Sequence, residues 1–284
     1  MPNEIKQLLE KHSITPNKVL GQNFLTDKNA VSALIKSVNI AKEDIILEIG
    51  PGTGAITKEL AKKARQVIAI EKDENMVNIL QKELEESKNV HIVQKDILKT
   101  EIKELFESLE IEIQNSGYKV VSAPPYYLTG RLFRHFLENS EIKPEAIALI
   151  IQKEVAQKIC AIPPDMNLLA ISVQLYGKPK IIQKVSKNAF WPKPEVDSAI
   201  LTVANIRQPS INEKLFFKLL RAGFSSPRKQ LSGNLSREFN VSKQKTEQLL
   251  KSVHINPKKR AQALQIEEWI TLLEKAPGLL YNNK

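Results

Sequence analysis

Three closely spaced glycines near residue 50 are the first residues whose pattern suggests ligand binding. Gly50, Gly52 and Gly54 lie in the segment ILEIGPGTGAIT, between an apolar run and a helical pattern. Glycines at such a junction allow a tight turn and a close approach of the backbone to a ligand, and the helix N-terminus adds a positive dipole end. Their G-x-G-x-G spacing is neither the G-x-G-x-x-G of dinucleotide-binding folds nor a P-loop. By itself the loop could also be a purely structural turn.

Two carboxylates follow this loop at the ends of successive apolar runs. Glu71 ends the run QVIAIE, roughly 20 residues after the glycines, where an acidic side chain can accept hydrogen bonds from both ribose hydroxyls. Asp96 ends the next run, in NVHIVQKD, although either residue alone could be a solvated strand-end carboxylate. Ligands of open α/β sheets bind outside the carboxyl ends of the strands, so the loop and both carboxylates are expected to share one crevice. A nucleoside held there without phosphate contacts indicates S-adenosylmethionine.

The segment VVSAPPYYLTG, residues 120–130, contains a second candidate feature. Two prolines and two tyrosines after a β-branched run form a rigid ledge suited to presenting an aromatic ring. Ala123 stands directly before this ledge and offers no polar side chain. The segment is therefore either an active site that lacks its polar group or only a turn.

Strands and helices alternate along the part of the chain that must position these residues. Apolar runs predict strands at 44–50, 66–73, 89–96 and 118–124, with helical patterns between them that include 55–64 and 74–87. Such alternation implies right-handed βαβ units and a parallel sheet covered on both faces. Later strand-like runs at 146–153, 178–186 and 198–206 extend the prediction to an α/β fold with a mostly parallel sheet of about seven strands.

Helical patterns predominate at both ends of the chain. Those at 4–12 and about 28–37, the second with Asp27 as its predicted N-cap, form a helical cap over residues 1–40. After residue 210 the pattern becomes helical again, and the predicted helices are 211–224, 242–253 and 265–276. We take RQPS, residues 207–210, as the linker region. The predicted domains are an α/β domain of residues 1–206 and a small all-α domain of residues 207–284.

Charge divides the chain in the same place. The sequence carries 42 Lys+Arg and 32 Asp+Glu, which gives a formal net charge of +10. Residues 207–284 hold 15 basic and 6 acidic residues, whereas residues 1–206 hold 27 and 26 and are close to neutral. This asymmetry favours a C-terminal domain that faces a polyanion, above all nucleic acid, although a solvated basic surface would have the same composition.

Composition argues against several other classes of protein. A single cysteine, Cys160, cannot form an internal disulfide and suits a reducing cytoplasm. With four histidines and no Cys/His cluster, no zinc site is expected and no metal is assigned. No apolar run reaches the roughly 20 residues of a membrane-spanning helix. The N-terminus, MPNEIKQLLEKHSI, resembles neither a signal peptide nor a transit peptide.

Taken together, these and other segments resemble one enzyme family. LGQNFL (residues 20–25), LEIGPGTG, IEKD, QKDIL, PPYYLT, QKEVAQKICA, FWPKPEVDSAI and FSSPRKQL occur in the order seen in KsgA-like ribosomal RNA small subunit adenine N6,N6-dimethyltransferases. The resemblance runs from about residue 3 to 275, and LGQNFL and the F-x-P-x-P-x-V-x-S pattern are its specific motifs. Macrolide-resistance methyltransferases of large-subunit RNA share most of the motifs. The Leu-Gly before QNFL and the extended helical tail are more similar to the KsgA-like branch.

The family implies a Rossmann-like, S-adenosylmethionine-dependent methyltransferase domain with a small, basic, helical RNA-binding domain. By resemblance, Gln22, Asn23 and Leu25 would close over the methionine end of the cofactor, which leaves as S-adenosylhomocysteine. Glu71 would hold the ribose and Asp96 the adenine N6. The other cofactor-binding residues that the resemblance implies are Gly50, Gly52, Gly54, Lys72, Ile97 and Ala123.

The implied substrate is a pair of adjacent adenines in a hairpin loop near the 3′ end of small-subunit (16S) ribosomal RNA. The enzyme would methylate them during ribosome assembly, with the immature 30S subunit as its partner. The basic segments SPRKQLSGNLSR and NPKKR would supply phosphate contacts. The protein is expected to be a cytoplasmic monomer with no membrane partner.

Methylation of an adenine amino group sets clear demands on the ledge, because the nitrogen lone pair is delocalised into the ring. A site assists by accepting hydrogen bonds from the amino N–H groups and by holding nitrogen, methyl carbon and sulfur in line. In the family, an Asn side-chain oxygen and the backbone carbonyl of the next residue accept these hydrogen bonds, while an aromatic ring stacks on the base. By resemblance, Pro124 supplies the carbonyl, Pro125 the ledge and Tyr126 the stacking ring. Phe190 would be the opposing wall, although both aromatics could also be core residues.

Ala123 stands where this family has Asn. Loss of one preorganised acceptor typically costs on the order of 100- to 1000-fold in rate. The change could be a catalytic knock-out, a natural slow variant, or one that Ser122 partly offsets, although neighbouring strand residues point to opposite faces. Three functions remain: a dimethyltransferase with reduced activity, an assembly factor that only binds pre-ribosomes, and a large-subunit methyltransferase of the resistance type. A small-molecule methyltransferase would leave the basic tail unexplained.

Overall fold

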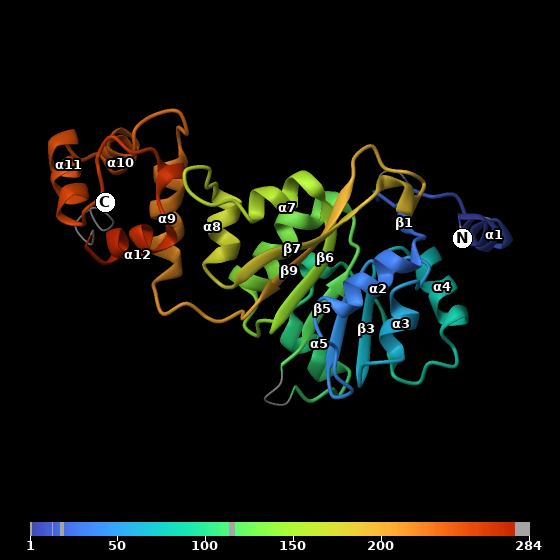
Figure 1. Ribbon diagram of the computed structural model, residues 1–284. Coiled ribbons are helices and arrows are strands. Elements are labelled where there is room, and N and C mark those ends of the chain that lie inside the picture. The colour runs from blue at the N-terminus through green and yellow to red at the C-terminus, as the bar shows by residue number, and fades with distance from the viewer. Residues whose placement is uncertain (1, 13, 18–19, 114–116, 276–284) are drawn as a thin grey trace. The chain divides into compact units, whose positions relative to one another are not determined.

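The computed structural model describes every residue except 1, 13, 18–19, 114–116 and 276–284 (Figure 1). It contains a seven-stranded sheet with strand order β4-β3-β2-β5-β6-β9-β7. The first five of these run parallel, whereas β9 is antiparallel to both β6 and β7. The expected α/β fold with a mostly parallel sheet is confirmed. The strands are β2 (Ile45–Ile49), β3 (Gln66–Glu71), β4 (Val90–Gln94), β5 (Lys119–Ser122), β6 (Ala146–Gln152), β7 (Lys178–Val185) and β9 (Ser198–Ala204).

Burial along the strands follows their position in the sheet. Every residue of the central strand β2 is buried, since helices cover a parallel sheet on both faces. The edge strands β4 and β7 are more exposed, and β7 alternates between exposed and half-buried residues over much of its length. The continuous apolar runs in the sequence therefore mark the interior of the sheet.

Helices follow most of the strands. Asp27 caps α2 as expected, because its carboxylate accepts hydrogen bonds from the backbone N–H groups of Asn29 and Ala30. Leu34 of α2 and Leu60 of α3 pack into one buried cluster with sheet residues such as Ile46. The helical segments of this part of the chain are α1 (Pro2–Lys11), α2 (Lys28–Lys36), α3 (Thr57–Ala61), α4 (Glu74–Glu83), η1 (Ile97–Lys99), α5 (Ile102–Ser108), η2 (Tyr126–Leu128), α6 (Thr129–Phe133), η3 (Arg134–Asn139), α7 (Lys153–Ile159) and η4 (Lys187–Ala189).

A second, two-stranded sheet joins distant segments of the sequence. β1 (Phe24–Leu25) pairs antiparallel with β8 (Phe190–Trp191). The backbone N–H of Thr26 also donates to the carbonyl of Ala189 at 2.8 Å. This pairing holds the N-terminal QNFL segment against the FWPKP segment, which sequence periodicity did not predict because each strand has only two residues.

The chain separates into two compact units. One comprises residues 1–157 and 177–207, and the other comprises residues 158–176 and 208–284. The single boundary expected after residue 206 differs from this division, because residues 158–176, from the end of α7 through α8 (Leu168–Gln174), also belong to the C-terminal unit. This excursion lies between β6 and β7, so no composition shift announces it in the sequence.

The C-terminal unit is helical, and it packs around one tryptophan. Trp269 is fully buried, and its ring lies so close to Gly223 that a Cβ atom there would be 2.3 Å from the ring. The remaining helical segments of this unit are α9 (Glu213–Phe224), α10 (Leu231–Phe239), α11 (Lys243–Ser252), η5 (Ala261–Ala263) and α12 (Ile266–Lys275). No predicted helix corresponds to α10, which begins within the basic segment SPRKQLSGNLSR and ends two residues beyond it. None of the described helices is long and apolar enough to cross a membrane.

Candidate active site

The glycine loop has the backbone conformation that only glycine adopts readily. Gly50, Gly52 and Gly54 have φ angles of +62°, +57° and +81°, all in the left-handed region. The loop is also tightly packed, since a Cβ atom on Gly52 would lie 2.9 Å from the ring of Phe24. A Cβ atom on Gly50 would lie 3.3 Å from Pro125. The loop therefore contacts both the QNFL segment and the proline ledge.

Glu71 lies at the end of β3 with its carboxylate held in place. Its Oε1 accepts hydrogen bonds from the backbone N–H groups of Lys72 at 2.7 Å and Asp73 at 2.9 Å. Burial raises the pKa of Glu71 above its usual value, and these backbone hydrogen bonds partly offset the rise. Asp73 in turn accepts a 2.7 Å hydrogen bond from Gln22 Nε2. Asp73 thus joins the two, because its backbone N–H donates to Glu71 and its carboxylate accepts from Gln22.

Asp96 lies just beyond the end of the neighbouring strand β4. Its Oδ1 accepts from the backbone N–H of Leu98 at 3.1 Å, and its Oδ2 pairs with Lys72 Nζ at 3.0 Å. Partial burial acts to raise the pKa of Asp96, but the Lys72 hydrogen bond and the Leu98 N–H outweigh it and keep the pKa below its usual value. Asp96 is therefore an ionised acceptor at neutral pH.

Glu48 is a buried carboxyl group directly before the glycine loop, which the sequence analysis did not single out. It is 1% exposed, and neither carboxyl oxygen forms a hydrogen bond of normal geometry with any described residue. Burial raises the pKa of Glu48 from 4.5 to about 8, while the nearby Thr57 hydroxyl lowers it and Glu71 raises it by smaller amounts. At neutral pH this side chain is therefore an uncharged acid beneath the loop.

The ledge presents one tyrosine ring against a phenylalanine. Tyr126 and Phe190 meet edge to face, with ring centroids 6.5 Å apart and an interplanar angle of 76°. The Tyr126 hydroxyl shares a 2.7 Å hydrogen bond with Ser198 Oγ at the start of β9. Burial raises the pKa of Tyr126, and Ser198 offsets only part of that rise, so the hydroxyl stays neutral. Phe190 is 5% exposed and is at once part of the core and of the cavity wall.

Ser122 does not take the place of the missing acceptor. It is fully buried, and its Oγ donates to the carbonyl oxygen of Ile49 at 2.5 Å. Ala123, by contrast, contributes to the wall of the cavity. The alternation of side chains along β5 thus turns Ser122 away from the site, as the sequence analysis expected.

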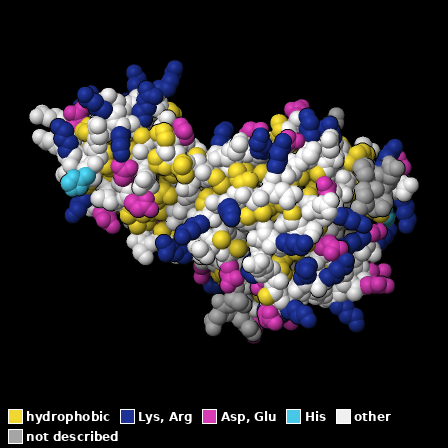
Figure 2. All heavy atoms as spheres, viewed as in Figure 1, with side chains coloured by type: hydrophobic (Ala, Val, Ile, Leu, Met, Phe, Trp, Pro, Cys, Tyr) yellow, Lys and Arg dark blue, Asp and Glu magenta, His cyan; other side chains and the backbone are white. Residues whose placement is uncertain are grey.

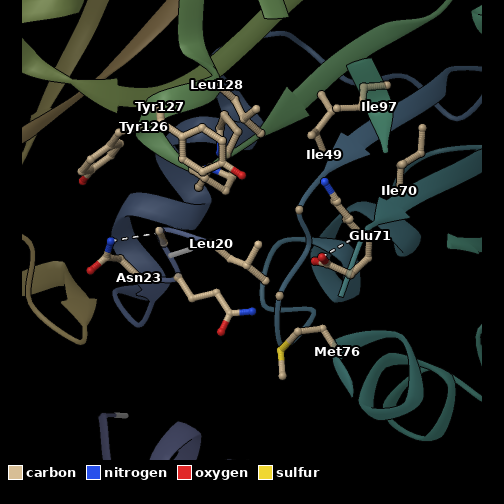
Figure 3. Close-up of a pocket in the computed structure, with 18 of the residues that line it drawn as sticks. Leu20, Asn23, Ile49, Ile70, Glu71, Met76, Ile97, Tyr126, Tyr127 and Leu128 are labelled. Atoms are coloured by element: carbon tan, nitrogen blue, oxygen red, sulfur yellow. Dashed lines mark hydrogen bonds between the residues drawn. The ribbon is translucent and has the colours of Figure 1, made fainter. Parts of the chain in front are cut away.

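One cavity brings together all the predicted site residues except Leu25 and Gly54. Figure 3 shows Tyr126 and Tyr127 on one side of this cavity and Glu71 and Met76 on the other. Leu25 is instead buried in the core beneath α2, and Gly54 packs against Leu80 of α4. The predicted residues that line the cavity are Gln22, Asn23, Gly50, Gly52, Glu71, Lys72, Asp96, Ile97, Ala123, Pro124, Pro125, Tyr126 and Phe190.

Several cavity residues were not predicted. Strand ends and the helix α4 supply the apolar walls of the cavity. Ile49 and Ile70 directly precede Gly50 and Glu71, and this position in the sequence could have indicated that they line the site. Tyr127 and Arg131 line the ledge side. Tyr127 is the second tyrosine of PPYYLT but was given no role, and Arg131 lies outside every quoted motif. The unpredicted lining residues are Leu20, Gly21, Phe24, Ile49, Ile70, Met76, Lys95, Leu98, Tyr127, Leu128, Arg131 and Ile150.

Comparison with known families identifies the family to which a chain with this site belongs. The family described as "Ribosomal RNA adenine dimethylase" matches residues 14–276, nearly the whole chain. This chain belongs to the ribosomal RNA adenine dimethylase family. The resemblance noted in the sequence is thereby confirmed, and the protein is an S-adenosylmethionine-dependent methyltransferase.

Curated relatives of this adenine dimethylase cover nearly its full length. "Ribosomal RNA small subunit methyltransferase A" of Dehalococcoides mccartyi is 41% identical over 270 residues, covering 94% of this chain and 90% of the relative. The protein of the same name from Clostridium botulinum is 38% identical over 270 residues, covering 93% and 95%.

Solved structures with the same fold are more distant in sequence. A dimethyladenosine transferase from Plasmodium falciparum has a TM-score of 0.73 at 24% identity, covering 90% of this chain and 98% of that one. The 23S rRNA methyltransferase ErmE has a TM-score of 0.70 at 23% identity, covering 89% and 99%. At this level of identity they establish the methyltransferase fold alone.

The residues of this adenine dimethylase fit its cofactor. When bound, S-adenosylmethionine supplies a methyl group on a positively charged sulfur, open to attack by a nucleophile. Glu71 offers a fixed carboxylate at the end of the second strand of the βαβ unit, where a ribose is expected. Ile49, Ile70, Met76 and Ile97 give the cavity apolar walls suited to a planar base. Among the described residues, no group of three or more His, Cys, Asp or Glu side chains is placed to hold a metal ion.

Proposed function

We propose that this adenine dimethylase transfers methyl groups from S-adenosylmethionine to N6 of two adjacent adenines in a 3′-terminal hairpin loop of 16S ribosomal RNA. Its partner is then the immature 30S subunit, and it acts as a monomer in the cytoplasm. The two curated relatives are named for the small subunit, which supports this target over the large-subunit alternative.

The Tyr126–Phe190 pair carries the proposal. Both aromatic residues line the cavity that also contains the glycine loop and Glu71. An unpaired adenine can stack on an aromatic ring, which is the usual way to present a base for chemistry. Tyr126 is oriented by Ser198 and stays neutral, so its ring offers a fixed apolar face to the base.

The backbone of the ledge supplies the hydrogen-bond acceptor for the adenine amino group. The Pro124 carbonyl accepts one N–H of the adenine amino group in this scheme, and Ala123 contributes none. Accepting that N–H localises the nitrogen lone pair, and the stacked base is held with the nitrogen directed at the methyl carbon. The proton released from the methylated nitrogen is acidic enough to leave to water, so the scheme needs no general base.

The cofactor roles rest on the same cavity. In the proposal Glu71 holds the ribose, Asp96 accepts the adenine N6 of the cofactor, and Lys72 and Ile97 flank that base. Gln22 and Asn23 close over the methionine end, and the backbone of Gly50 and Gly52 lines its binding loop. Leu25 and Gly54 support this arrangement from the core, since neither lines the cavity.

A basic hollow on the C-terminal unit supports an RNA-binding role for that unit. Lys and Arg side chains project from this unit in Figure 2. One hollow near the start of α10 is lined by six basic residues and by no acidic residue, which suits a phosphate backbone. Its basic residues are Arg228, Lys229, Arg237, Lys243, Lys258 and Arg260.

Ala123 favours a second candidate function. With no side-chain acceptor at this position, the protein could bind cofactor and RNA while transferring methyl groups slowly. In that case the protein acts as an assembly factor that only binds immature subunits. The binding surfaces are the same in both functions, so only methyl transfer distinguishes them.

Tritiated-methyl incorporation tests the proposal. The full-length protein is incubated with labelled S-adenosylmethionine and either unmethylated small subunits or large subunits. We expect slow label incorporation into small-subunit RNA alone, and its loss in Tyr126→Ala. Label in large-subunit RNA would contradict the proposed target. No label from either the wild-type protein or the Ala123→Asn variant would instead support the assembly factor.

A further inference from the structure

A second tyrosine lies at the mouth of the cavity, and the proposed reaction does not use it. Tyr127 is 50% exposed, whereas Phe190, the aromatic partner of Tyr126, is 5% exposed. The large exposed hydrophobic residues of the described chain are Tyr127, Ile162, Leu168 and Ile182, so Tyr127 is the aromatic one among them. An aromatic ring left in water beside a base-binding cavity is a candidate for binding a second planar group.

The ring of Tyr127 is supported on one side by backbone. Gly21, in the left-handed region with φ of +64°, lies against it, because a Cβ atom there would be 3.4 Å from Tyr127 Cδ1. Tyr127 itself belongs to η2, directly after the ledge, and Figure 3 shows it beside Tyr126 on the cavity wall. The position of the ring is therefore set by the same rigid elements that set the catalytic ring.

Arg131 gives this exposed ring a cationic neighbour. Its guanidinium carbon lies 5.7 Å from the Tyr127 ring centroid, which is a cation–π distance but too long for close stacking. Arg131 is exposed and lines the same cavity, and no carboxylate of the described chain forms an ion pair with it. Its charge is thus available to an anion that reaches the cavity mouth.

An RNA nucleotide matches this pair of side chains. Its base can stack on an aromatic ring, and its phosphate can accept from a guanidinium. Consecutive Cα atoms are about 3.8 Å apart, so rings on adjacent residues can serve adjacent nucleotides of one strand. Since the proposed substrate is single-stranded at the target, its neighbouring base is also free to leave the stack.

We propose that Tyr127 and Arg131 form a second nucleotide-binding site, in which the Tyr127 ring stacks on the base next to the target adenine and Arg131 binds its phosphate. This site rests on the proposed function, because it presupposes that an RNA base enters the Tyr126 site. It would select for an unpaired nucleotide beside the target, and it would hold the second of two adjacent adenines while the first is methylated.

Binding measurements with a fluorescent hairpin test the second site without relying on activity. The full-length protein is titrated into hairpin RNA that carries 2-aminopurine on the 5′ or the 3′ side of the target adenine. We expect stacking on Tyr127 to quench the fluorescence at one of these two positions. Tyr127→Ala should abolish this quenching and weaken binding about 5- to 150-fold, the range for loss of one base–aromatic stack.

Conservative variants separate stacking from general effects. Tyr127→Phe should keep both the quenching and the affinity, and Arg131→Lys should bind more tightly than Arg131→Ala. Ile182→Ala, an exposed residue of the edge strand β7, is the matched surface control and should bind like the wild type. When the hairpin carries an abasic nucleotide beside the target adenine, Tyr127→Ala should cause no further loss of RNA affinity.

Two kinds of failure can be told apart. Unchanged affinity and no loss of quenching in Tyr127→Ala would overturn the second site. If binding by the wild type still depends on the target adenine and on Tyr126, the proposed function is unaffected by that result. Wild-type protein that does not distinguish this hairpin from one without the adenines would overturn both.

Discussion

Ala123 is the residue on which the expected rate of methyl transfer depends. Its methyl side chain lines the cavity beside Pro124 and offers no acceptor to the adenine amino group. Ala123→Asn should therefore raise the initial rate of methyl incorporation on the order of 100- to 1000-fold. Ala123→Leu is the matched control, because it fills space without an acceptor, and it should give no gain. Equal rates for wild type and Ala123→Asn would show that this position does not limit the reaction.

Glu48 makes the stability of the protein depend on pH. Its pKa is raised from 4.5 to about 8, so the folded state keeps a proton that the unfolded chain loses. The resulting stabilisation is complete below pH 4.5 and is lost progressively as the pH rises to about 8, at about 1.4 kcal/mol per pH unit.

Glu48→Gln replaces the neutral acid by an uncharged group of similar shape, so it should remove this dependence. Urea unfolding at pH 5, 6.5 and 8 measures the effect. The free energy of unfolding of the variant should rise relative to the wild type as the pH increases. A constant difference across this range would mean that Glu48 is already ionised in the folded protein.

At the scale of elements, the glycine loop depends on its contact with β1. Gly52 has a φ of +57°, and a Cβ atom there would lie 2.9 Å from Phe24. Gly52→Ala should lower the free energy of unfolding by about 1–3 kcal/mol through strain, and should weaken S-adenosylmethionine binding measured by calorimetry. Gly130→Ala is the control, since nothing lies within 4 Å of its Cβ position and its φ is not positive. An equal loss in both variants would contradict the role assigned to the loop.

The elements that sequence could predict are those with a long, regular pattern. The runs around Ile46, Ile68 and Ile92 identified β2, β3 and the edge strand β4, and the carboxyl ends of β3 and β4 located Glu71 and Asp96. The two-residue strands β1 and β8 have no periodicity, so the approach of Phe24 to Gly52 could not be predicted.

The candidate site shows the same limit. Motif residues located most of the cavity, but the side chains that complete it come from tertiary packing. Leu25 belongs to a family motif yet is turned into the core, and Glu48 lies in a buried strand where only three-dimensional burial reveals its raised pKa. Tyr127 and Arg131 are ordinary surface residue types, so their pairing is visible only in the structure.

At the scale of the whole molecule, the proposed function assigns phosphate contacts to the basic hollow of the C-terminal unit. The double substitution Lys258→Ala and Arg260→Ala removes two cations from the hollow near α10. RNA affinity should fall, and the slope of log K against log salt should become shallower by about 1.4–1.8, since each phosphate contact contributes about 0.7–0.9. Lys178→Ala, on the edge strand β7, is the control and should leave the slope unchanged. A slope that is the same in both variants would remove the hollow from the RNA interface.

The claim that this protein dimethylates two adjacent adenines of small-subunit RNA can be measured directly. Unmethylated small subunits are incubated with the protein and S-adenosylmethionine, and nuclease fragments of their 16S RNA are analysed by mass spectrometry. We expect a fragment from the 3′-terminal hairpin to gain up to four methyl groups, slowly with the wild type, faster with Ala123→Asn and not at all with Tyr126→Ala. A hairpin fragment of unchanged mass with both wild type and Ala123→Asn would contradict it.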